Sequence, residues 1–308
     1  MLTEFCRRYS NPKTAADYRR TLAHLFRWTA TRHPADLSES DLLEWVTHGS
    51  PANNTVYQRT TKVCTFMRWC HRAGLTDVNV AEALRDRHSP LRTFTRTYGK
   101  VQSRHPGRWL THDEAFGTLV ANCDDGTEVG LRDEIVLRLG LAGMRLSEIA
   151  SLRVRNVRRL PTITWTGKGS KPRTMTGGTG LVDAVRRYLD AYPDVTDDDP
   201  LICRLVMGAS RQGAPPRIDW HTDASTRGLY DLITKRARAC GLGHVAPHDL
   251  RRTAAGILHR ATNDDGAHFF DLLDIQKVLG HSDPATTMRS YLAPMDTDVY
   301  DRAATVLD

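Results

Sequence analysis

Three segments of the sequence carry cationic and protic side chains that could act together on one phosphodiester. Arg145 follows a glycine turn at the start of a short expected helix, and His248 and Arg251 lie three residues apart, so both project from one helix face. His281 stands at an expected helix end, and Tyr291 follows ten residues later. Because a guanidinium can bind phosphate oxygens at two points, these residues predict a phosphate site.

Each residue alone has a simpler interpretation. Arg145 could only cap the preceding helix, and a lone histidine in a turn is more often structural than catalytic in a chain with 13 histidines. GKGS at 167–170 lacks the hydroxyl residue and the upstream glycine of a phosphate loop, and no HExxH, GxSxG or GxGxxG motif occurs. Pro247 separates His244 from His248, which argues against a shared metal-binding face. The sequence therefore lacks the motifs of several nucleotide-binding, hydrolase and metal-dependent enzyme classes.

The second part of the chain, 109–308, must position these groups, and its pattern is mainly helical. Thr111 and Glu114 form a capping box at the start of the first helix, and Gly143 permits a turn before a short helix at 146–152. Alternation around a glycine-rich centre predicts a β-hairpin at 160–175. The remaining helices are expected at 131–141, 181–192, 226–240, 248–260 and 271–279.

The first part, 1–86, is expected to be a small all-helical domain. Apolar residues at three- and four-residue steps predict helices at 13–30, 39–46, 55–73 and 78–84, the second of them capped by Ser38. A basic linker, 87–108, joins the two domains. The stretch from Arg85 to Arg108 carries seven Arg or Lys against one Asp, and it could lie along a phosphate backbone or be only a solvated segment.

Length and composition fit a folded protein of about two domains that binds a polyanion. The chain has 308 residues, a net charge of +7 and 40% hydrophobic residues, which argues against disorder and a coiled coil. No stretch has the roughly 20 apolar residues of a membrane span, and the N-terminus lacks a secretory signal, so we expect a cytoplasmic protein. Six scattered cysteines without a C-x-x-C pair predict reduced thiols.

Taken in order, the motifs resemble those of the tyrosine recombinase (phage integrase) family. The resemblance runs from G-x-R-x-x-E at Arg145 through GKGSKPR, with Lys168, to H-x-x-R at 248–251, LGHSDPATT and Tyr291. It implies an Xer-like two-domain form, mainly α with a small antiparallel β-sheet. A SAM-like helical domain at 1–86 would bind the core site, and an α+β catalytic domain would occupy 109–308.

The resemblance also implies a site-specific recombinase or integrase, as found in mobile elements, that cuts and rejoins DNA without metal or ATP. Tyr291 would attack the scissile phosphate, giving a 3′-phosphotyrosine and later a Holliday junction. Arg145 and Arg251 would clamp the non-bridging oxygens, and His281 would donate a further hydrogen bond.

Proton transfer would fall to other residues of the same motifs. Lys168 is the expected general acid for the leaving 5′ oxygen, with Lys171 as the alternative. His248 would accept the tyrosine proton or orient the tyrosine. Glu148 would orient a neighbouring donor, or would only pair with Arg145 along the helix.

Two departures from the family pattern concern the spacing of these motifs. Relatives commonly place the tyrosine nine residues after the histidine, whereas here Ser290 holds that position and Tyr291 follows. Tyr300 is therefore an alternative nucleophile. The segment 261–270 is longer than usual and predicts a surface loop.

The expected partner is double-stranded DNA with short core recombination sites, bound by a homotetramer on two sites. A C-terminal helix at 296–308 would dock between protomers. The helix at 55–73 either enters the major groove or only packs against the first helix. Three DNA-binding residues are expected to be exposed on this helix and three more to lie in the linker. They are Gln58, Arg59, Lys62, Arg92, Arg96 and Lys100.

Three other functions remain open at this point. A type IB topoisomerase-like enzyme would nick and reseal one duplex with the same residues. A catalytically inactive DNA-binding regulator would have the same fold. An RNA-binding or nucleoid protein would form no covalent adduct.

Overall fold

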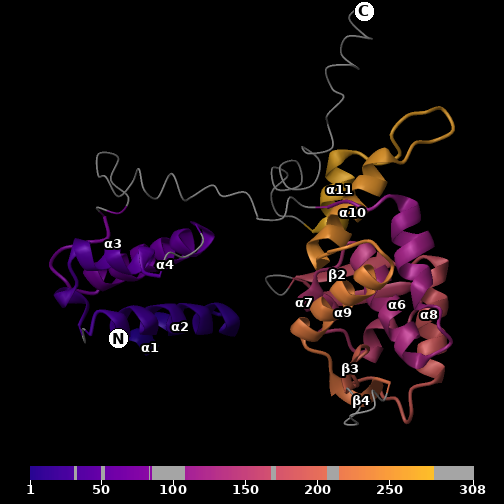
Figure 1. The fold of residues 1–308 in the computed structure, drawn as a ribbon, viewed down its shortest axis with the longest axis horizontal. Helices are drawn as coiled ribbons and strands as arrows, with labels where there is room; N and C mark the ends of the chain where they lie inside the picture. Colours follow the sequence, from indigo (N-terminus) through magenta and orange to yellow (C-terminus); the bar gives the residue numbers. More distant parts are fainter. Residues whose placement is uncertain are drawn as a thin grey trace, which may run out of the picture. The chain divides into compact units, whose positions relative to one another are not determined.

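The computed structural model describes residues 1–30, 33–49, 53–82, 84, 108–167, 171–206 and 215–280. The chain divides into two compact units, Met1–Arg104 and His105–Asp308, and each is described by itself (Figure 1). Within these ranges no helix combines the length and the apolar character that crossing a membrane requires.

The first unit is a small helical assembly. Its elements are α1 (Leu2–Arg7), α2 (Pro12–Trp28), the short 3-10 turn η1 (Pro34–Asp36), α3 (Glu39–Thr47) and α4 (Asn53–Arg72). Asn11 caps α2 by accepting from the backbone N–H groups of Lys13 and Thr14, and Ser38 and Asp41 form a capping box at α3. The core joins all four helices through buried apolar side chains that include Phe5, Leu25, Trp45, Phe66 and Met67.

One expectation for this unit is wrong, and one helix was not predicted. Residues 78–82 form turns, in which the Glu82 N–H donates to the Asn79 carbonyl at 2.9 Å, so the expected helix at 78–84 is not present there. Nucleating a helix costs conformational entropy, and a segment this short forms too few helical hydrogen bonds to offset that cost. The sequence interpretation also missed α1, whose six residues are too few to show a period.

The second unit contains helices and two hairpins. Its elements are the π-helical η3 (Asp113–Val120), η4 (Ala121–Cys123), α6 (Glu128–Leu141), α7 (Leu146–Ile149), η5 (Val154–Val157), β1 (Thr162–Thr166), β2 (Pro172–Thr176), α8 (Thr179–Asp190), β3 (Cys203–Val206), β4 (Arg217–Asp223), α9 (Thr226–Ala239), α10 (Pro247–Arg260) and α11 (Leu272–Leu279). The mainly helical fold with small antiparallel sheets is as predicted.

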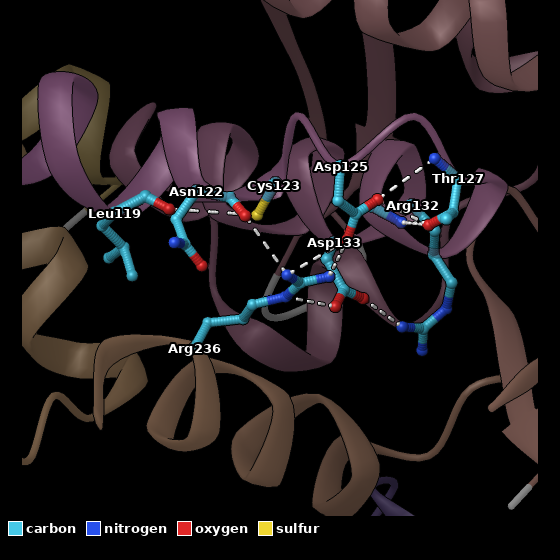
Figure 2. Close-up of polar contacts among 9 residues, drawn as sticks. Leu119, Asn122, Cys123, Asp125, Thr127, Arg132, Asp133 and Arg236 are labelled. Carbon is cyan, nitrogen blue, oxygen red and sulfur yellow. Dashed lines mark hydrogen bonds and ion pairs between the residues drawn. The ribbon is translucent and has the colours of Figure 1, made fainter. Parts of the chain in front are cut away.

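Helix α6 is the centre of this unit and packs against α8, α9 and α10. It is buried on every side, which leaves three successive charged residues, Arg132, Asp133 and Glu134, at most 5% exposed. Buried charges require partners. Asp133 is held by Arg132 at 2.7 Å and by Arg236 of α9 at 2.9 Å (Figure 2), so the ion pairs tie α6 to α9.

Both hairpins are antiparallel. The pairing of β1 with β2 places Thr164 opposite Thr174 and confirms the hairpin expected at 160–175. The pairing of β3 with β4 has an irregular register between Cys203 and Arg204, and this second hairpin was not predicted. The β1–β2 hairpin matters most for the candidate site, because β2 carries a side chain that reaches α11.

Candidate active site

The C-terminal end of α11 gathers arginines from separate parts of the second unit. Gly280 ends the helix in the left-handed conformation, with φ of +61°. Arg145 Nη2 donates to the Gly280 carbonyl at 3.0 Å, and Arg251 Nη2 donates to the Leu279 carbonyl at 2.8 Å. Arg251 Nη1 also donates to the Gly143 carbonyl. The structure thus brings together the two arginines that the sequence predicted to act on one phosphate.

Arg145 is the N-cap residue of α7 and is fixed by Glu148. Its backbone N–H donates to Glu148 Oε2 at 2.9 Å, while its Nη1 donates to Glu148 Oε1 at 3.0 Å. The Glu148 side chain is 5% exposed. Gly143, with φ of +90°, makes the turn between α6 and α7 that brings Arg145 to this place. Both interpretations of Glu148 agree with these contacts, because pairing with Arg145 also orients it.

Arg251 lies on α10 and is 2% exposed, and His248 lies at the start of the same helix. Loss of hydration lowers the pKa of His248, and the positive charges of Arg251 and Arg252 lower it further. The imidazole is therefore neutral at pH 7 and able to accept a proton. The buried carboxylate of Asp249 fixes the start of α10 by accepting from the Ala246 N–H at 2.9 Å.

A third arginine at the end of α11 was missed by the sequence interpretation. Arg173 of β2 donates through Nη2 to the carbonyls of Lys277 at 2.9 Å and Val278 at 2.8 Å. Its guanidinium lies over the ring of Trp165 at 5.2 Å. Burial lowers the pKa of Arg173, the carboxylate of Glu148 raises it, and Arg145 lowers it. Arg173 and Arg145 therefore both bind carbonyls of the last residues of α11, at 277–278 and at 280 respectively.

Several predicted residues lie outside the described part of the chain. They are Lys168, His281, Tyr291, the alternative nucleophile Tyr300, the linker residues Arg92, Arg96 and Lys100, and the segment 296–308. Lys171, the alternative general acid, is exposed immediately before β2. In the sequence, Lys168 follows Gly167 and His281 follows Gly280, so the two segments begin at described residues.

The three residues of α4 expected to face DNA differ in exposure. Gln58 is exposed, but Arg59 is partly buried and donates to the carbonyls of Trp45 at 3.0 Å and His48 at 3.1 Å. The Lys62 side chain is 11% exposed and pairs with Asp17 of α2 at 2.6 Å. The expectation that all three are exposed is wrong, because α4 packs against α2 and α3. Their role in DNA binding stays a prediction.

Metal binding has no candidate site in the ranges that the structure describes. No group of three or more His, Cys, Asp or Glu side chains there could hold an ion. The cationic cluster at the end of α11 is instead suited to an anion, because Arg forks bind phosphate oxygens.

The model of the phage integrase family matches residues 108–297 of the sequence, which is more than half of the chain. The chain belongs to the phage integrase family. The tyrosine recombinase XerC of Corynebacterium efficiens is 31% identical over 239 residues. That match covers 76% of this chain and 65% of the relative. The tyrosine recombinase XerD of Neisseria meningitidis serogroup A is 26% identical, over 90% of this chain and 86% of its own length.

Solved structures of the family share the fold. The XerH site-specific recombinase, in a post-cleavage complex with palindromic difH substrate, matches 99% of this chain and 84% of its own, with a TM-score of 0.66 and 16% identity. A lambda integrase dimer bound to a COC′ core site matches 92% of this chain and 93% of its own, with a TM-score of 0.62 and 13% identity. The predicted family and fold class are therefore confirmed.

Proposed function

We propose that this phage integrase family member is a site-specific DNA recombinase that cuts and rejoins strands through a 3′-phosphotyrosine intermediate and a Holliday junction. One observation carries the proposal. Arg145 and Arg251 reach the same helix end from two different helices, with donor atoms bonded to adjacent carbonyls. His281, the third expected phosphate ligand, follows Gly280 directly in the sequence.

In the proposed first step, the Tyr291 hydroxyl oxygen attacks the scissile phosphorus. A bond forms between that oxygen and phosphorus, and the bond between phosphorus and the 5′ oxygen breaks. The tyrosine proton passes to neutral His248, and Lys168 protonates the departing 5′ oxygen. Attack by a 5′ hydroxyl of the partner strand reverses these transfers and releases the tyrosine.

Arg145 and Arg251 stabilise the charge that the non-bridging oxygens gain in the transition state. Fixed donors that need no rearrangement at that moment supply a large part of such catalysis. The support for fixed donors here is that Glu148 and the carbonyls at 143, 279 and 280 already hold both guanidinium groups. His281 adds a further donor to the same phosphate.

The proposed substrate is double-stranded DNA carrying short core sites, bound by a homotetramer on two sites. Solved structures of the family include recombinases bound to DNA, among them a lambda integrase tetramer bound to a Holliday junction. Phosphate contacts would supply most of the affinity and make it fall steeply with salt. The expected contacts are Gln58, Arg59, Lys62, Arg92, Arg96 and Lys100, and the segment 296–308 would dock on a neighbouring protomer.

The experiment is covalent trapping on nicked suicide duplexes that carry candidate core sites, in buffer without metal. Wild-type protein should give a denaturant-resistant adduct, and Tyr291→Phe should give none. An adduct that persists in Tyr291→Phe and disappears in Tyr300→Phe would move the nucleophile to Tyr300. The absence of an adduct on a site that the protein binds would favour a DNA-binding regulator.

Strand exchange separates recombination from simple nicking and resealing. Two duplexes with different flanking lengths should yield recombinant products and a four-way junction intermediate. Relaxation of supercoiled DNA without recombinant products would instead indicate a topoisomerase-like enzyme.

A further inference from the structure

The Arg173 side chain fills the space between the β1–β2 hairpin and the end of α11. It starts on β2, passes over the Trp165 ring at 5.2 Å, and ends with Nη2 bonded to the carbonyls of Lys277 and Val278. Trp165 itself is 7% exposed. The side chain is therefore held along its length by both elements.

Two glycines leave the room that this side chain needs. A Cβ atom on Gly167 would lie 2.8 Å from Arg173 Cδ, closer than real Cβ contacts come. A Cβ atom on Gly280 would overlap Arg173 Nη1 and Cζ. Gly167 immediately precedes Lys168 in the sequence, and Gly280 immediately precedes His281. The Arg173 side chain thus packs on both glycines that directly precede an expected catalytic residue.

Charge also links Arg173 to the arginine cluster. The negative charge of Glu148, the carboxylate that pairs with Arg145 at 3.0 Å, raises the pKa of Arg173, although burial lowers that pKa more. The negative end of the α11 dipole lies at the same place and favours cations there. Electrostatic interactions and packing therefore both hold the Arg173 guanidinium at the end of α11.

We propose that Arg173 is a positioning residue: it fastens the β1–β2 hairpin to the end of α11, and protonation of the leaving 5′ oxygen depends on that contact. This inference rests on the proposed function. Arg173 touches neither substrate nor the reacting atoms in this assignment. It acts through Gly167, at the point where β1 leads into Lys168.

The test compares two suicide duplexes that differ in one atom. In the second duplex, sulfur replaces the bridging 5′ oxygen at the scissile phosphate. A thiolate leaves without a proton, because the pKa of a thiol is about 8.5. The sulfur substrate therefore reports tyrosine attack and phosphate stabilisation, whereas the oxygen substrate also needs the proton donor.

We expect Arg173→Met to slow single-turnover cleavage of the oxygen substrate about 100-fold, as small displacements of catalytic groups do. The sulfur substrate should recover at least about tenfold of that loss, within the range that general acid catalysis supplies. Arg173→Lys keeps the charge but loses the paired contact to two carbonyls, so it should fall between Met and wild type. Arg186→Met removes an exposed charge on α8, which is paired only loosely with Asp183 at 4.0 Å, and should leave both rates unchanged.

Gly167→Ala tests the packing without removing charge. Its Cβ should displace Arg173 and slow the oxygen substrate, and it should add little in the Arg173→Met background, because both changes then act on one contact. The ratio of the two substrates' rates in one preparation does not depend on the folded fraction, so partial unfolding of a variant does not obscure the result.

Three outcomes would overturn the inference while leaving the proposed function intact. They are an unchanged cleavage rate in Arg173→Met, an equal loss on both substrates, and a loss explained entirely by weaker DNA binding. If wild-type protein forms no adduct on either substrate, the proposed function fails instead.

Discussion

Removal of the Asp133 carboxylate should destabilise the second unit strongly. Asp133 lies on α6 with its side chain 6% exposed, between Arg132 at 2.7 Å and Arg236 at 2.9 Å (Figure 2). The Arg132 side chain is 3% exposed, and its Nε donates to the Cys203 carbonyl at 2.6 Å. Asp133→Ala would leave this guanidinium buried without its carboxylate and would remove an ion pair that joins α6 to α9.

The loss can be estimated from the burial of the partners. Breaking a buried ion pair from one side costs about 3–5 kcal/mol, because the remaining charge stays desolvated. In a unit of about 200 residues, each kcal/mol lowers Tm by about 2–4 °C, so the expected decrease is about 6–20 °C. The matched control is Asp231→Ala, which removes the ion-pair partner of Arg227 on α9. The Asp231 side chain is 40% exposed and that of Arg227 is 80% exposed, so the free energy of unfolding should fall by only about 0.3–0.5 kcal/mol.

Because the chain has two units, the assay must resolve them. Pulsed hydrogen exchange with mass spectrometry along a urea series reports peptides of α6 and α9 separately from those of α4. Asp133→Ala should shift the α6 and α9 transitions to lower urea and leave the α4 transition in place. A shift no larger than that of Asp231→Ala would refute the reasoning, since it would mean that the charges on α6 are well solvated.

Three further predictions concern the proposed chemistry. Arg145→Lys and Arg251→Lys should each slow cleavage about 10²–10³-fold and weaken DNA binding much less, which single-turnover and filter-binding assays separate. Because the pKa of His248 is lowered, its imidazole is neutral above that pKa; cleavage should fall only as the pH drops through a value below 6.5, and His248→Gln should abolish that acid limb. An acid limb that persists in His248→Gln would assign it to another group. Replacing three linker cations with alanine should reduce the slope of log K against log salt by about 2.7, from 0.9 per phosphate contact, and an unchanged slope would exclude those contacts. The three residues are Arg92, Arg96 and Lys100.

The features predicted correctly from the sequence depend on neighbours in the chain. Thr111 and Glu114 form the expected capping box. The Thr111 N–H donates to Glu114 Oε2 at 2.8 Å, and the Glu114 N–H donates to Thr111 Oγ1 at 3.1 Å. Gly143 adopts the positive φ that its turn requires. Both features depend only on residues within about one helical turn of the chain, so residue types and their spacing are enough to predict them.

The features that were missed depend on contacts between distant segments. Arg173 and Val278 are 105 residues apart, and their hydrogen bond has no periodic or motif signal. The available signal was the pair of glycines at 167 and 280, each directly before an expected catalytic residue. The β3–β4 hairpin was not predicted, because residues 207–216 separate its strands and its outer positions are polar. The burial of Lys62 likewise follows from α2, which lies more than 30 residues away.

The gathering of Arg145, Arg173 and Arg251 at one helix end means that folding itself brings like charges together. The helix dipole and Glu148 offset this repulsion only at short range. Added salt screens the remaining repulsion and so should stabilise the second unit, whereas the same salt weakens association with DNA. The salt concentration at which the second unit is most stable should therefore be higher than the salt concentration at which DNA cleavage is fastest. A buffer chosen for storing the protein should differ from the one chosen for assaying it.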